Sequence, residues 1–172
     1  MAISRNNPAN IRYVVTNNWQ GQTGSDGGFV VFDTLANGVR AHIKLIGNYM
    51  NLYGLQTIEG IIYRFSPPSE NNTENIIQFI TTCTGMTRSE IFNWEDPRFE
   101  NFIRCHQQIE SGESAPDNVI SSEYIKLYGE QQANIQTAGL FDFENINIIN
   151  LIIIGTLLFI IAGEWLKSKR NG

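Results

Sequence analysis

Two polar stretches in the first half of the sequence carry residue types that could bind and cut a sugar chain. The first reads RNNPANIRY and continues, after a short apolar run, as NNWQGQTGSDGGF; the second reads SPPSENNT. A tryptophan face can stack on a sugar ring while amide side chains hydrogen-bond its hydroxyls. A carboxyl group on a loop with two prolines suits general acid catalysis on a glycosidic bond. The candidate sugar-binding residues are Asn7, Asn10, Arg12, Trp19, Gln22 and Asn71.

Two carboxylates are the candidate catalytic groups. Glu70 is the candidate general acid, because it lies on the loop that the two prolines restrain. Asp26 is the second, as a stabiliser or base if the bond is hydrolysed. Glu59 and Glu74 are weaker candidates, since both fit solvated charges on helices. Structural alternatives stay open: Asn-Pro pairs form turns, the tryptophan fits a core position, and Glu70 fits a helix cap.

The elements that must hold these residues are a small hairpin and four helices. The run FVVF at 29–32 predicts a short buried strand, paired with the region of Tyr13. Apolar residues recurring every three or four positions predict the helices, and glycine or proline marks their ends. The predicted helices cover 35–53, 58–66, 73–82 and 97–110.

The C-terminal stretch 146–163 reads INIINLIIIGTLLFIIAG and contains no charged residue. As a helix it is long enough to cross a hydrocarbon core of about 30 Å. Trp165 and the basic residues after it fit an interfacial anchor. We therefore expect a transmembrane helix at 146–166 and a basic tail at 167–172. The alternatives are a buried core helix and an amphipathic partner helix.

The expected fold class is mainly α (α+β): a lysozyme-like helical domain with a small β-hairpin, followed by one C-terminal transmembrane helix. The domain is expected at 1–110, and the polar residues 111–145 are expected to form a linker or stalk, with one possible short helix at 121–129. The orientation in the membrane stays open. The N-terminus lacks the apolar core of a signal peptide, which favours a cytoplasmic domain, whereas the basic tail itself favours the cytoplasmic side.

Composition excludes several classes of function. The chain has 172 residues and a formal net charge of −5, which argues against nucleic acid as its partner. Its two histidines and two cysteines show no ligand spacing, so we expect no metal site and no cofactor. Cys83 and Cys105 are expected to be buried free thiols, with a single bridge as the alternative.

Several motifs in the same order carry a family resemblance. They are RNNPANIRY, WQGQ, DGGFVVF, NGVRA and YGLQTIEGIIYRFSPPSENNT, which together span about residues 5–85. The sequence resembles a family of phage virion-associated lytic proteins, often labelled structural protein P5, that look like lysozyme or lytic transglycosylase domains. The positions that match the family's motifs are Asn7, Pro8, Asn10, Arg12, Asp26, Phe29, Phe32, Gly38, Arg40, Ala41, Pro67, Glu70, Asn71 and Thr73.

The sequence also departs from that family. Ala9 and Phe65 stand where members more often have glycine and tryptophan, and losing the glycine predicts a different local turn. The general lysozyme plan places its catalytic glutamate before the hairpin, and this chain has no glutamate before Glu59. Either the acid comes from elsewhere in the chain, with Glu70 as the best candidate, or the domain binds glycan without cutting it. Glu70 could suffice alone in a transglycosylase, because there the substrate's own hydroxyl is the nucleophile.

The resemblance implies a peptidoglycan-degrading protein of a phage virion, a lytic transglycosylase or lysozyme-like glycosidase that lets phage DNA enter the host. With the predicted anchor, it would be a single-pass protein of the virion membrane or the host inner membrane. Its expected partners are peptidoglycan glycan strands, the membrane and capsid proteins. The alternative is a catalytically inactive minor structural protein that links the viral membrane to the capsid. A holin-like or toxin-like protein is disfavoured, because one anchor on a large domain is not a pore-forming arrangement.

Overall fold

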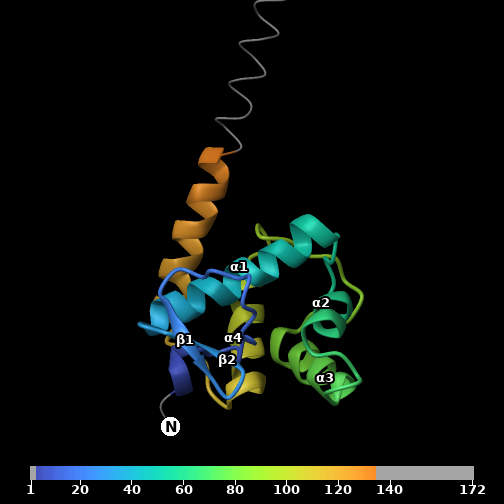
Figure 1. The fold of residues 1–172 in the computed structure, drawn as a ribbon. Coiled ribbons are helices and arrows are strands. Elements are labelled where there is room, and N and C mark those ends of the chain that lie inside the picture. Colours follow the sequence, from blue (N-terminus) through green and yellow to red (C-terminus); the bar gives the residue numbers. More distant parts are fainter. Residues whose placement is uncertain (1–2, 135–172) are drawn as a thin grey trace, which may run out of the picture. The chain divides into compact units, whose positions relative to one another are not determined.

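A computed structural model describes residues 3–134 (Figure 1), and the residues up to Tyr128 form one compact unit. A short 3-10 helix (Ser4–Asn6) precedes a two-stranded antiparallel sheet. The elements after it are β1 (Gln22–Asp26), β2 (Phe29–Phe32), α1 (Leu35–Tyr53), α2 (Ile58–Phe65), α3 (Thr73–Thr84) and α4 (Phe99–Ser111). A further helix covers 117–134. The prediction of a mainly helical fold with one small hairpin is confirmed.

The hairpin forms, but the strand that pairs with β2 is not the predicted one. The antiparallel partner of β2 is β1, which lies in the glycine-rich stretch, and Gly27 and Gly28 form the turn with φ of 56° and 84°. Two adjacent left-handed residues suit a tight hairpin turn, and glycine adopts them without strain. The predicted partner, the region of Tyr13, joins β2 through one bridge between Arg12 and Phe29.

Local capping explains why the helices begin and end where they do. The side chains of Thr34, Thr57 and Asn72 accept a hydrogen bond from a backbone N–H in the first turn of α1, α2 and α3. Such caps satisfy donors that the helix leaves unpaired. Glycines with positive φ then end α1, α3 and α4. The predicted bounds of α1 and α2 match the structure to within one residue.

The four helices share one hydrophobic core. In the view of Figure 1, α4 runs between the hairpin and the α2–α3 pair. A second, smaller apolar cluster lies under the hairpin and includes Ile11, Val30 and Phe32. Gly38 of α1 allows the N-terminal segment to cross this helix closely, because a Cβ there would lie 1.8 Å from the carbonyl oxygen of Asn6.

The two cysteines form a disulfide bond, which corrects the expectation of free thiols. Cys83 on α3 and Cys105 on α4 are bonded, and their Cα atoms lie 6.1 Å apart. The sequence indicated only that two cysteines are too few for a disulfide framework. Packing of α3 against α4 brings the residues into bonding range, and sequence spacing does not reveal that packing.

The compact unit extends beyond Glu110, where the sequence placed the start of a linker. Ala115, Ile120 and Leu127 are buried, and the ring of Tyr124 stacks on that of Trp94. Residues 115–128 therefore complete the core instead of forming a stalk. The predicted linker residues 135–145 lie outside the described part of the chain.

Within residues 3–134, no helix is both long enough and apolar enough to cross a membrane. This finding corrects the expected fold class, which included a transmembrane helix. The longest complete helix there, α1, has 19 residues but carries Arg40, His42 and Lys44. The stretch predicted to span the membrane, 146–166, and the basic tail at 167–172 lie outside the described residues.

Replacing Gly47 by Ala is expected to lower the free energy of unfolding by about 2 kcal/mol. A Cβ at position 47 would lie 1.7 Å from Cζ2 of Trp94, and that indole is held by stacking on Phe99 and Tyr124. Urea unfolding of the full chain measures the change. Gly129→Ala is the matched control, because it lies in a helix with no atom within 4 Å of the added Cβ. Equal stability of both variants would contradict the prediction.

Candidate active site

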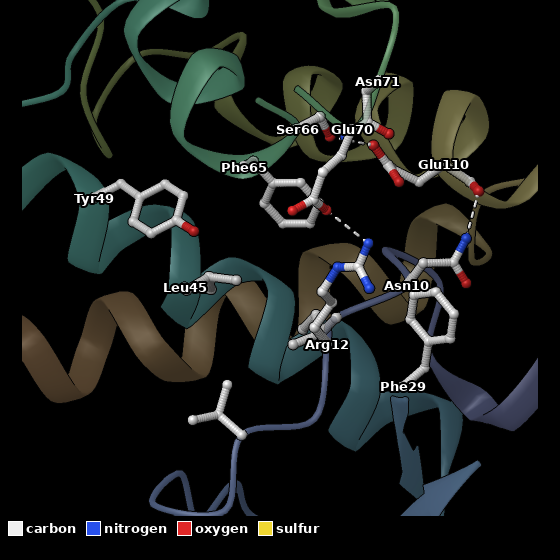
Figure 2. A pocket seen from close by; sticks show the side chains of 12 residues that line it. Asn10, Arg12, Phe29, Leu45, Tyr49, Phe65, Ser66, Glu70, Asn71 and Glu110 are labelled. Atoms are coloured by element: carbon white, nitrogen blue, oxygen red, sulfur yellow. Dashed lines mark hydrogen bonds and ion pairs between the residues drawn. The ribbon is translucent and has the colours of Figure 1, made fainter. Parts of the chain in front are cut away.

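A pocket of about 420 Å³ opens where the N-terminal segment, α1, the loop after α2 and the end of α4 meet (Figure 2). Segments that are far apart in the sequence form its walls. The residues that line it are Asn10, Ile11, Arg12, Val14, Phe29, Leu45, Tyr49, Phe65, Ser66, Glu70, Asn71 and Glu110.

An exposed ion pair crosses the mouth of this pocket. Arg12 Nη2 lies 2.8 Å from Glu70 Oε2, and the two side chains are 67% and 51% exposed. The backbone N–H of Glu70 donates to the carbonyl of Pro67, so the loop forms a turn that presents the carboxylate. The guanidinium of Arg12 also lies over the ring of Phe29, 5.6 Å from its centroid. Figure 2 shows the guanidinium and the carboxylate pointing toward one another.

A second carboxylate, Glu110, lies in the last turn of α4 and is largely withdrawn from solvent. Its side chain is 16% exposed, and Oε1 accepts a hydrogen bond of 3.0 Å from the hydroxyl of Ser66. Its backbone carbonyl accepts a hydrogen bond of 2.5 Å from the Asn10 amide. These contacts fix Glu110 at the junction of three segments. The site therefore contains two carboxylates in different environments.

Glu110 was not among the residues that the sequence suggested. It lies outside the motifs with family resemblance, at the end of a helix. One signal was available, because Phe102, His106 and Glu110 recur at a spacing of four along the buried face of α4. A carboxylate on an apolar stripe is uncommon without a function or a partner.

Four of the eight predicted site residues line the pocket: Asn10, Arg12, Glu70 and Asn71. Asn10 has a left-handed backbone with φ of 48°, a conformation that asparagine adopts more readily than most residues. Ala9 is not among the residues with positive φ, so its backbone conformation does not require a glycine. The predicted Asn-Pro turn thus directs the Asn10 amide toward α4.

The other four predicted residues lie elsewhere. Asn7 is buried, and its amide bonds the backbone of Ile11 and Val30, which is a structural role. Asp26, the last residue of β1, is exposed and forms an ion pair with Arg5 of the N-terminal 3-10 helix. The backbone N–H of Trp19 donates to Gln22, and the indole packs on the small apolar cluster under the hairpin. Trp19, Gln22, Asn7 and Asp26 are not among the residues that line the pocket.

The two weaker candidates also lie outside the pocket. Glu59 and Glu74 both pair with Arg88, at 2.5 and 3.1 Å. Hydrogen bonds from Arg88 and from Tyr63 hold the pKa of Glu74 below its ordinary value, so this carboxylate stays ionised. Both residues therefore match the solvated helix charges that the sequence suggested as their alternative role.

The remaining pocket wall combines apolar groups with one phenol. Burial raises the pKa of Tyr49, against the opposing effect of the nearby Arg64. The Tyr49 hydroxyl therefore remains protonated at neutral pH and can both donate and accept hydrogen bonds. Apolar walls with a few fixed polar groups are typical of pockets that bind organic ligands. Within residues 3–134, no group of three or more histidine, cysteine or acidic residues is placed to hold a metal ion.

Three fully buried polar residues, His42, His106 and Gln107, lie behind Glu110. His42 Nε2 lies 3.0 Å from His106 Nδ1, and Gln107 Nε2 lies 3.3 Å from His42 Nδ1. Burial, and to a lesser extent the neighbouring His106, hold the pKa of His42 well below its ordinary value of 6.5. His42 is therefore neutral in the folded protein at neutral and mildly acidic pH.

This buried histidine is expected to make the fold less stable in acid. Below about pH 6.5 the unfolded chain binds a proton at His42 that the folded protein does not bind, so unfolding is favoured as pH falls. His42 should lower the free energy of unfolding by about 1.4 kcal/mol per pH unit below that value. Urea unfolding between about pH 7.5 and 5 measures this slope. In His42→Gln, the free energy of unfolding should fall less steeply with decreasing pH, by the contribution of one proton, or about 1.4 kcal/mol per pH unit. An unchanged slope would contradict the prediction.

Comparison with known proteins identifies one relative. No protein-family profile matches the chain. Protein P5 of Pseudoalteromonas phage PM2 is 35% identical to it over 114 residues, which is 64% of this chain and 70% of that protein. Identity of this level over most of the phage protein indicates common descent and a shared fold.

Proposed function

We propose a function that follows from the family: this chain belongs to the family of protein P5 of Pseudoalteromonas phage PM2. The expected relationship to a phage protein is thereby confirmed. The finer function is our proposal, namely that the chain is a virion-associated protein that cleaves the glycan strands of peptidoglycan. Such cleavage would let phage DNA pass the host cell wall.

One observation carries this proposal: the pocket holds a shielded carboxylate beside an exposed one. Glu110 is 16% exposed and hydrogen-bonded to a hydroxyl, whereas Glu70 is 51% exposed and paired with an arginine. Glycosidases use carboxyl groups in contrasting environments, because the environment decides which group donates a proton. Amide, phenol and guanidinium groups on the same walls can bind sugar hydroxyls.

Glu110 is the proposed general acid, in place of Glu70. Its carboxyl group would give a proton to the glycosidic oxygen as the bond to the anomeric carbon breaks. In a lytic transglycosylase, a hydroxyl of the same sugar then attacks that carbon and returns its proton to the Glu110 carboxylate. In a hydrolase, water takes the place of this hydroxyl. Arg12 and Glu70 would bind the sugar chain, since they form the exposed rim of the pocket.

The disulfide supports a site of action outside the cytosol. Disulfides such as Cys83–Cys105 persist in the periplasm and on virion surfaces, and are rare in reducing compartments. Peptidoglycan lies in the same oxidising compartment. The disulfide is therefore consistent with a protein that acts where peptidoglycan is found.

Zymography of the full chain tests the proposal. The protein is separated without reductant on a gel that contains purified peptidoglycan, and is then renatured; a cleared band is expected. Mass spectrometry of the products separates the two reactions, because a transglycosylase product is one water lighter than the hydrolysis product. Full-length protein with the folded far-UV spectrum and no cleared band would overturn the enzymatic proposal.

A second function is favoured by one contact. The Arg12–Glu70 ion pair already uses the two most exposed charged groups of the pocket, which fits a protein that no longer binds a substrate there. Such a chain would be a catalytically inactive structural protein of the virion, in contact with capsid proteins. It would occur in virions in fixed stoichiometry, and substitution of Glu110 would leave host-wall lysis by particles unchanged.

A further inference from the structure

The polar residues buried behind the pocket form a hydrogen-bonded chain with a fixed direction. The backbone N–H of Ala115 donates to Gln107 Oε1 over 2.9 Å, which sets the orientation of that amide. Gln107 Nε2 must then face His42 and donate to its Nδ1, at 3.3 Å. An accepting Nδ1 makes His42 the neutral tautomer that carries its proton on Nε2.

The tautomer of His42 in turn fixes the tautomer of His106. His42 Nε2 donates to His106 Nδ1 over 3.0 Å, so His106 is also neutral and carries its proton on Nε2. Within residues 3–134, this His106 N–H is one of the few buried side-chain groups without a hydrogen-bond partner. The carboxylate oxygen Oε1 of Glu110 lies 3.7 Å from it. The chain therefore ends at the pocket with one unused donor directed toward Glu110.

Packing holds the His106 ring in this direction. The His106 and Phe65 rings pack edge to face with 4.5 Å between their centroids, and the Phe102 ring packs on His106 with 5.7 Å between centroids. Histidine, glutamine and histidine together fill core positions that apolar residues could fill. A fully connected buried polar network has a fixed geometry, whereas a buried donor without a partner is costly.

We infer that His106 is a positioning residue for Glu110, whose carboxylate it holds through Nε2–H while the chain Ala115–Gln107–His42 fixes the ring. This inference rests on the proposed function, in which Glu110 is the acid. The present 3.7 Å is too long for a hydrogen bond, and catalytic contacts are often long in the absence of substrate and shorten in the complex. The bond would hold the carboxylate oxygen as it gives up its proton to the glycosidic oxygen.

Two variants of His106 test the inference in the full chain. The Gln side chain has an oxygen that accepts and a nitrogen that donates hydrogen bonds, so it can replace both nitrogens of the Nε2–H imidazole, whereas Leu can replace neither. Turbidity assays on purified peptidoglycan should show that His106→Leu lowers kcat by about tenfold to 100-fold while KM changes little. His106→Gln should recover most of that loss. Wild-type kcat in His106→Leu, or equal losses in the two variants, would overturn the positioning role.

A second measurement separates this inference from the proposed function. The chain has only two histidines, so ¹H–¹⁵N spectra of the side chains contain two ring systems, and the set that His106→Gln removes is assigned to His106. Both should be Nε2–H tautomers at neutral pH, and Glu110→Gln should shift the Nε2–H signal of His106 more than that of His42. An Nδ1–H tautomer in either ring overturns the inference. An inactive wild type overturns the proposed function instead, and the spectra alone then decide whether His106 holds Glu110.

Discussion

Replacing Glu110 by Gln is expected to slow peptidoglycan cleavage by about 100-fold or more, which is the usual loss when a general acid is removed. The glutamine amide has nearly the same shape and can still accept the hydrogen bond from Ser66, but it has no acidic proton to give. The loss should therefore appear in kcat. Loss of turbidity of a peptidoglycan suspension, at several substrate concentrations, measures it.

The comparison with Glu70→Gln decides which carboxylate is the acid. Glu70 is half exposed and its charge is paired with Arg12, so its substitution should weaken substrate binding and raise KM more than it lowers kcat. Asp26→Asn changes an exposed carboxylate that does not line the pocket, and activity within about twofold of the wild type is expected. If Glu70→Gln abolishes cleavage while Glu110→Gln retains it, the assignment made from the sequence alone is right and the one made from the structure is wrong.

Helices with clear capping residues at their start and end were predicted correctly from the sequence. The helices α1 and α2 have a threonine cap at the start and a glycine or proline after the end, and both were located to within one residue. β1 was missed because its glycine-rich sequence is typical of a loop, and only pairing with β2 makes it a strand. The helix at 117–134 was predicted only as a possible short helix at 121–129 inside a linker, although Ile120, Tyr124 and Leu127 recur at helical spacing and are buried or half-buried.

Sequence reasoning identified only those pocket residues that lie in conspicuous polar motifs. Arg12 and Glu70 come from motifs that stand out as polar loops, and the fold brings them together over 58 positions. Asn7 and Trp19 come from the same polar stretches but do not reach the pocket. The Asn7 amide bonds the backbone of Ile11 and Val30, and the Trp19 indole packs on the apolar cluster under the hairpin. Glu110 reaches the pocket only because α4 packs against the loop after α2, and such a tertiary contact leaves no local signal in the sequence.

Removing the disulfide is expected to have the largest effect on stability of the substitutions considered. Cys83 and Cys105 close a loop with a sequence separation of 22, and such a cross-link restricts the unfolded chain. A loop of this length contributes about 3 kcal/mol. The thermal midpoint should fall by about 10 °C in a domain of this size. Thermal unfolding of the full chain, followed by circular dichroism with and without dithiothreitol, measures the difference.

The double variant Cys83→Ala, Cys105→Ala separates the bond from the packing of its sulfur atoms. Cys105 is fully buried, so the variant also leaves a small cavity and should be somewhat less stable than the reduced wild type. Its stability should not depend on dithiothreitol. Because α4 carries both Cys105 and Glu110, loss of the bond should loosen the helix that supplies the proposed acid, and cleavage should decline on heating before it does in the oxidised protein. Identical unfolding curves with and without reductant, with the bond shown to be broken by thiol titration, would mean that the packing of α3 on α4 alone maintains the fold.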